Sequence, residues 1–178
     1  SIKVVSTVKS VLIEVGAQDS NATINLEGET QTGVWRGSKI LASDDEEYDF
    51  TITAEDGTLS PTTYTIKVER LDGNTDIQTI TVKYNVNGTA KTVVPALQGD
   101  GSYFVKLPKL DEERVILRIV AERATTKVNV LGTEGKGSLY GYVNLTGEVT
   151  RIPIIVTAED GSTFETTLIV EKESNVTT

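Results

Sequence analysis

The sequence has 178 residues, a formal net charge of −9 and a pI near 4.6, and it contains neither histidine nor cysteine. The acidic balance argues against nucleic acid as a partner, and no apolar run is long enough for membrane insertion. Without histidine and cysteine, Ser-His-Asp catalysis, His-bound zinc, thiolate chemistry and a disulfide framework are excluded.

The periodic segments of the chain are built from Val, Ile, Thr and Tyr, with apolar residues at every second position. This is the period of a strand with one buried face. No long window has apolar residues at the helical spacing. The sequence therefore predicts an all-β protein.

In chain order, the first half predicts strands at 11–17 and 22–27, a short strand near 33–37, and a closing hairpin. The hairpin is centred on Thr53-Ala54-Glu55-Asp56-Gly57, where Asp-Gly is typical of a tight turn. The apolar alternation resumes after it, so the two flanking strands are expected to pair.

The same five letters return as Thr157–Gly161, at an offset of 104 residues. At this offset the segment from residue 11 to 57 matches residues 115 to 161 without a gap. The matched second-half strands are 115–121, 126–131 and one within 137–145. Two copies of one fold follow from this repeat.

The connector Arg70–Asp76 is short, polar and contains a turn signal, so the boundary is placed near residue 73. The predicted domains are 1–73 and 74–173, and residues 174–178 are expected to be a linker or tail.

The second copy has two predicted strands, Ile77–Val86 and Ser102–Leu107, that have no counterpart in the first. The first copy is therefore expected to be an N-terminally truncated sandwich, with Ile2–Val5 filling part of the gap. An incomplete sandwich has an unpaired strand edge. We expect strand complementation of this edge by another chain or by an upstream fragment that remains bound.

Both copies resemble the bacterial cadherin-like β-sandwich domain of surface and secreted proteins. The family's closing hairpin reads VTAEDGS followed by YTIKVER. The first copy matches it at Thr51–Gly57 and Tyr64–Arg70, whereas the second has Thr166 and Lys172 in place of Tyr and Arg. The resemblance implies two tandem Ig/cadherin-like Greek-key β-sandwiches.

The resemblance also implies an extracellular location, on a bacterial cell surface or in a secreted protein. The expected role is that of a non-catalytic spacer or adhesion element beside other modules of the same polypeptide. The alternative is a carbohydrate-binding module for cell-wall or extracellular polysaccharide. Glycoside hydrolysis needs two carboxylates across a cleft, and the recurring Glu-Asp pairs lie at turns instead, so we do not expect an enzyme.

Tyr140 and Tyr142 are the candidate sugar platform, because both alternate with Leu139 and so face away from the core. Trp35 aligns with Leu139 and is predicted to lie in the core. No cofactor is expected, although Asp72, Asn74 and Asp76 could supply oxygen ligands to calcium.

Ile155 and Ile169 are apolar residues on the predicted outer face of the second closing hairpin. We expect them to be neighbours across one antiparallel strand pair. Two such side chains indicate an interface covered by the other domain or by a second chain.

Overall fold

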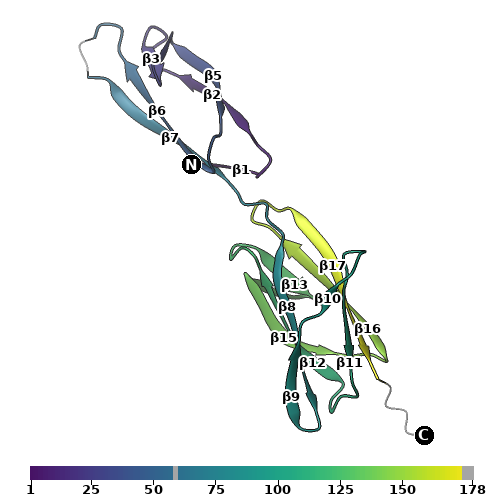
Figure 1. Cartoon of the computed structure of the whole chain (residues 1–178). Helices are drawn as coiled ribbons and strands as arrows, with labels where there is room; N and C mark the ends of the chain where they lie inside the picture. Colours follow the sequence, from purple (N-terminus) through teal and green to yellow (C-terminus); the bar gives the residue numbers. More distant parts are fainter. Residues whose placement is uncertain (58–59, 174–178) are drawn as a thin grey trace. The chain divides into compact units, whose positions relative to one another are not determined.

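The computed structural model describes residues 1–57 and 60–173, and it divides at Asp72/Gly73 into two compact units (Figure 1). We call residues 1–72 unit 1 and residues 73 onward unit 2. The predicted tail, 174–178, lies outside the described residues. The described residues of both units form strands and turns and contain no helix, so none that could span a membrane, and the all-β prediction is confirmed.

The described residues of unit 1, 1–57 and 60–72, form seven strands in two sheets. A five-stranded sheet has the order β1-β7-β6-β3-β4, and a two-stranded sheet pairs β2 with β5. The strands are β1 (Ile2–Val4), β2 (Ser10–Gly16), β3 (Thr23–Leu26), β4 (Glu29–Thr32), β5 (Val34–Ile40), β6 (Asp45–Thr53) and β7 (Thr62–Arg70). Side chains from both sheets, including Ile13, Ile24 and Trp35, form one core.

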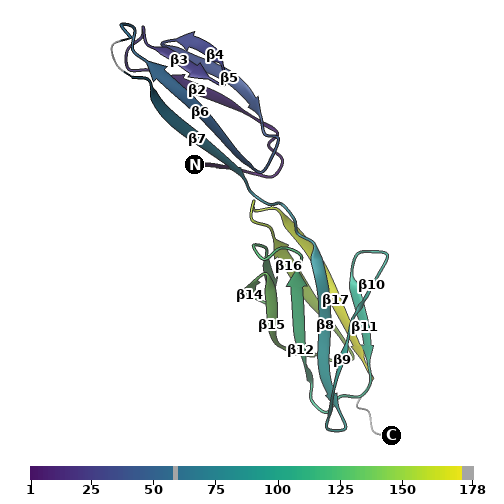
Figure 2. The same cartoon turned by 60° about the vertical axis from the view of Figure 1, so that its left-hand side comes forward.

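Residues 73–173, the described part of unit 2, form ten strands, also in two sheets (Figure 2). One has the order β10-β11-β17-β16-β13-β14 and the other β15-β12-β8-β9. The strands are β8 (Ile77–Val86), β9 (Thr89–Val93), β10 (Ala96–Leu97), β11 (Tyr103–Leu107), β12 (Arg114–Ala121), β13 (Lys127–Val130), β14 (Thr133–Lys136), β15 (Ser138–Asn144), β16 (Val149–Thr157) and β17 (Thr163–Lys172). Their inward aliphatic side chains share one core, so each unit is an immunoglobulin-like β-sandwich.

Backbone bonds confirm that the two units repeat one architecture. The Leu41 amide donates to the Lys9 carbonyl at 2.9 Å, and the matching Leu145 amide donates to the Glu113 carbonyl at 2.8 Å. Strands β1 to β7 thus correspond in order to β11 to β17. The predicted strands at 11–17, 115–121 and 22–27 are present as β2, β12 and β3.

The sequence-based prediction missed one hairpin in each unit, β3–β4 and β13–β14. Their tight turns place Glu27 and Leu131 at φ of 51° and 52°, each followed by a glycine with positive φ. Glutamate and leucine rarely adopt this left-handed conformation. The two turns read Glu27-Gly28 and Leu131-Gly132, so they lack the Asn-Gly or Asp-Gly pair that usually predicts a tight hairpin turn. In the closing hairpin of unit 2, by contrast, Gly161 alone takes the positive φ, and the Asp160 carboxylate accepts the Ser162 N–H at 2.8 Å.

Replacing Leu131 by asparagine is expected to stabilise unit 2 by about 1 kcal/mol, because asparagine tolerates the left-handed conformation far better than leucine. Leu131 is 63% exposed, so little buried contact is lost. Thermal unfolding followed by circular dichroism would measure the change. Leu131→Ala is the control, since alanine keeps the same strain; an equal gain from alanine would contradict the explanation.

Two strands of unit 2 were predicted to have no counterpart in unit 1, and the structure confirms this for one of them. Strand β8 lies against β12 in unit 2, and within residues 1–57 and 60–72 no strand takes the equivalent place beside β2. Strand β11, however, does have a counterpart. The short β1 pairs in parallel with β7 as β11 pairs with β17, so Ile2–Val4 replaces the end of β11.

Candidate functional site

The outer face of the sheet β15-β12-β8-β9 carries the two tyrosines that the sequence singled out. Tyr140 and Tyr142 are each 65% exposed, whereas Leu139 and Val143 on the same strand are buried. Strand alternation explains this arrangement, because consecutive side chains point to opposite faces of the sheet.

Strand pairing determines which side chains lie beside the tyrosines. On β12, Ile116 is opposite Tyr142 and Arg118 is opposite Tyr140. On the far side of Ile116 lies Lys83 of β8. A row of aromatic, aliphatic and basic side chains therefore crosses three strands. Sequence reasoning missed Ile116, Arg118 and Lys83, because their place on this face depends on strand order.

Arg114 lies against the ring of Tyr142, with its guanidinium carbon 4.7 Å from the ring centroid. This is a cation–π contact. Arg114 also forms an ion pair with Glu112, and that hydrogen bond raises the pKa of the guanidinium. The pair holds Arg114 over one face of the ring and places a carboxylate beside it.

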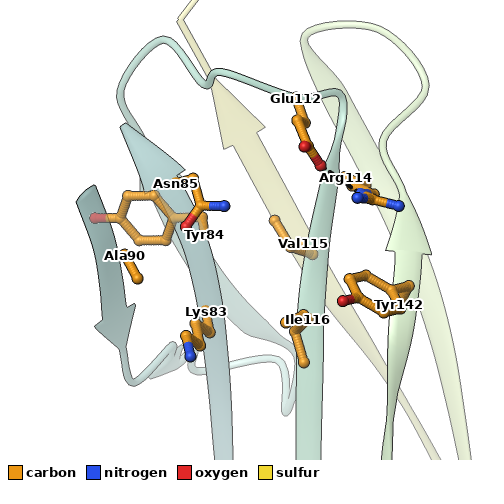
Figure 3. Close-up of a pocket in the computed structure, with 9 residues that line it drawn as sticks. All are labelled: Lys83, Tyr84, Asn85, Ala90, Glu112, Arg114, Val115, Ile116 and Tyr142. Carbon is orange, nitrogen blue, oxygen red and sulfur yellow. Dashed lines mark hydrogen bonds and ion pairs between the residues drawn. The ribbon is translucent and has the colours of Figure 1, made fainter. Parts of the chain in front are cut away.

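These residues line a depression of about 170 Å³, which Figure 3 shows. Tyr142 borders it from β15, Arg114 and Ile116 from β12, and Lys83 and Asn85 from β8. The lining combines the rings of Tyr84 and Tyr142 with an amide, a carboxylate and two cations. Such a surface can stack against the apolar face of a sugar ring and hydrogen-bond its hydroxyl groups.

The proposed calcium ligands are distributed over both units. Asp72 closes unit 1, whereas Asn74 and Asp76 belong to unit 2. The Asn74 amide donates to Asp76 at 3.3 Å and to Glu122 at 3.4 Å, and the Asp76 N–H donates to the Asn74 side chain at 2.8 Å. In the part of the chain that the structure describes, no group of three or more acidic side chains is placed to hold a metal ion.

The prediction that Ile155 and Ile169 are neighbours is wrong. Ile155 lies opposite Glu165, while Ile169 lies opposite Arg151 and beside Phe104. Ile155 is 37% exposed and Ile169 is half-buried, so the two do not form one apolar patch. The error is one of register, which the alternation along each strand does not determine.

The prediction that Trp35 is a core residue is confirmed. Its side chain is 0% exposed, and its counterpart Leu139 is also buried. The ammonium group of Lys39 lies 5.4 Å from the centroid of the ring. Trp35 is therefore not available as a sugar platform.

No protein-family model matches the chain, and no curated protein matches it in sequence. Among solved structures, the chain is similar to the fibronectin(III)-like modules of Clostridium thermocellum CbhA, with 10% identity and a TM-score of 0.39. That match covers 99% of this chain and 94% of the other.

Proposed function

We propose that the chain is a non-catalytic pair of cadherin-like modules that spaces or presents other modules of an extracellular bacterial protein. The observation that supports this role is the nature of the residues that recur in both units. The side-chain oxygens of Asn25 and Asn129 accept hydrogen bonds from the backbone N–H groups of Gly28 and Gly132, both at 3.2 Å. These asparagines hold the β3–β4 and β13–β14 hairpins closed.

Two recurring glycines are also explained by the backbone conformation. Gly33 and Gly137 have φ of 74° and 70°, and a Cβ on Gly33 would lie 2.6 Å from the Ser20 carbonyl oxygen. Only glycine fits there without strain. The exposed tyrosines, by contrast, do not recur, since unit 1 has Arg36 and Ser38 at their positions. What the two units share is thus a scaffold.

A second candidate function is polysaccharide binding by unit 2, which the outward tyrosine pair and its polar surroundings favour. Tyr142 and Ile116 offer an aromatic and aliphatic surface, and Lys83 and Arg114 offer donors for hydroxyl or carboxylate groups. Under this proposal the ligand is a cell-wall or extracellular polysaccharide.

A binding survey with the whole chain separates the two functions. If unit 2 binds polysaccharide, replacing Tyr140 and Tyr142 together by alanine is expected to weaken binding about tenfold or more, because two stacking contacts are lost. Affinity electrophoresis in gels containing soluble polysaccharides, together with a glycan array, would measure this. Tyr64→Ala is the matched control, since Tyr64 is 49% exposed but lies in unit 1.

The result assigns the function directly. Binding that is lost in the double variant and kept in the Tyr64 variant supports carbohydrate recognition at this face. Binding that survives the double substitution would show that the site is wrong. Absence of binding to every polysaccharide in the survey leaves the spacer role as the function of the pair.

A further inference from the structure

The sheet β15-β12-β8-β9 of unit 2 is basic, although the chain as a whole is acidic. Its four strands contain Lys83, Lys91, Arg114 and Arg118 but neither aspartate nor glutamate. The whole sequence, by contrast, has 26 acidic residues against 17 basic ones. Of the four cations, Arg114 pairs with Glu112, which precedes β12.

Lys83 and Arg118 are exposed and lie on β8 and β12, the two central strands of this sheet. A lysine on an edge strand, such as Lys91 on β9, protects that edge from pairing with other strands. This explanation does not apply to the central strands. Within residues 1–57 and 60–173, the side chains of Lys83 and Arg118 form neither an ion pair nor a hydrogen bond. Both cations are therefore available to a ligand.

The matching sheet of unit 1 has balanced charges at the equivalent positions. Glu14 and Arg36 lie opposite each other on β2 and β5 and form an ion pair, with 2.9 Å between Arg36 Nε and Glu14 Oε2. At the offset of 104 residues they correspond to Arg118 and Tyr140, which lie opposite each other on β12 and β15. Unit 2 thus has a cation where unit 1 has an acid, and an aromatic ring where unit 1 has the balancing cation.

The aromatic rings and the unpaired cations form two rows across the strands. Tyr142 is opposite Ile116, and Ile116 is opposite Lys83, so the tyrosine and the lysine lie on the two sides of Ile116 (Figure 3). In the next row, Tyr140 is opposite Arg118. Neighbouring strands are about 4.8 Å apart, so the backbones that carry Tyr142 and Lys83 are roughly 10 Å apart. A sugar chain that crosses the strands can therefore stack one ring on the tyrosine and place an acidic group of a later sugar at the lysine.

We propose, on the basis of polysaccharide binding by unit 2, that the ligand is a polyuronate, a polysaccharide whose sugars carry carboxylates. Lys83 and Arg118 bind the carboxylates, and Tyr140 and Tyr142 contact the sugar rings. Arginine binds a carboxylate through two parallel hydrogen bonds, and lysine binds it as a point charge. Charges are screened beyond about 8 Å at physiological ionic strength, so these local cations outweigh the net charge of −9. Glu112 beside the depression opposes a more densely charged polymer, such as a sulfated one.

The first test compares polymers that differ only in charge. The whole 178-residue chain is titrated calorimetrically, in calcium-free buffer, with polygalacturonate, alginate and hyaluronate and with the methyl ester of each. At least one acidic form is expected to bind about tenfold or more tightly than its ester, because the ester loses the charge-assisted hydrogen bonds. Its binding is also expected to weaken as salt is added. Equal affinity for the acidic and esterified forms would overturn the proposal.

The second test removes the two cations. Lys83→Gln with Arg118→Gln is expected to weaken binding of the acidic polymer about tenfold and to leave binding of its ester unchanged. Lys106→Gln with Arg151→Gln is the matched control. It removes one lysine and one arginine that are exposed on β11 and β16, in the other sheet of unit 2. The control is expected to change the affinity less than about twofold. Equal weakening by both pairs would show that binding follows net charge, and would overturn the proposal.

Polysaccharide binding and carboxylate recognition fail in different ways. If Tyr140→Ala with Tyr142→Ala abolishes binding to both forms of a polymer while Lys83→Gln with Arg118→Gln affects neither, unit 2 binds polysaccharide but does not recognise the acid. Tighter binding of dextran sulfate than of every polyuronate would show that charge density is recognised, which also overturns the proposal. If no polymer binds, neutral or acidic, polysaccharide binding itself is wrong and the polyuronate proposal is wrong with it.

Discussion

Gly37→Ala is expected to destabilise unit 1 by about 1–3 kcal/mol, because the added methyl group overpacks the core. A Cβ on Gly37 would lie 2.3 Å from Trp35 Cη2 and within 2.9 Å of two further ring atoms. The Trp35 ring is 0% exposed and cannot move aside without disturbing its neighbours. Urea unfolding followed by tryptophan fluorescence would measure the loss in unit 1 alone.

Gly141 supplies the matched control, since it occupies the equivalent position in unit 2. No atom lies within 4 Å of a Cβ placed there, because Leu139 is smaller than Trp35. Gly141→Ala is therefore expected to be neutral or to stabilise unit 2 by about 0.4–1 kcal/mol, through the lower entropy of the unfolded chain. Similar losses in both units would show that backbone conformation, and not the tryptophan ring, determines the effect.

Arg70→Lys is expected to destabilise unit 1 by about 1.5–3 kcal/mol, although it keeps the charge. The guanidinium donates to the carbonyl oxygens of Ser43 at 2.7 Å, Leu41 at 3.2 Å and Val8 at 3.4 Å. Lysine cannot reproduce this fork of donors, so these acceptors lose their partners. Urea unfolding monitored by Trp35 fluorescence would again report on unit 1.

Unit 2 shows what lysine needs at this position. Lys172 corresponds to Arg70, and its ammonium group pairs with Glu113. The residue of unit 1 that corresponds to Glu113 is Lys9, which has the wrong charge. Adding Lys9→Glu to Arg70→Lys is therefore expected to recover about 1 kcal/mol relative to adding Lys9→Gln. Equal stability of the two double variants would contradict this account of why the units differ.

The closing hairpins and the general class of the fold could be predicted from the sequence because their signals are local. Alternation along β16 places Ile152, Ile154 and Val156 on one face, and the Asp-Gly turn ends the strand. The exposure of Tyr140 and Tyr142 and the burial of Trp35 follow from the same period of two. None of these inferences requires knowledge of which strand lies alongside.

The β3–β4 and β13–β14 hairpins were not predicted because their turns contain residue types that are unusual in such turns. Their turns use Glu27 and Leu131 in a conformation that these residue types seldom adopt. Tertiary contacts can stabilise such a turn against the preference of its own residues, and no propensity rule includes those contacts.

Register and strand order were decided by the tertiary structure. Periodicity identifies the face of a side chain, but a shift along the partner strand changes its neighbours, as Ile155 and Ile169 illustrate. The surroundings of Tyr142 likewise depend on β12 and β8, which approach β15 from distant parts of the chain. The sequence by itself determined which residues face the core. Long-range strand pairing determined which of these residues are neighbours, because the stabilising energy of a sheet comes from side-chain contacts between paired strands and not from single strands.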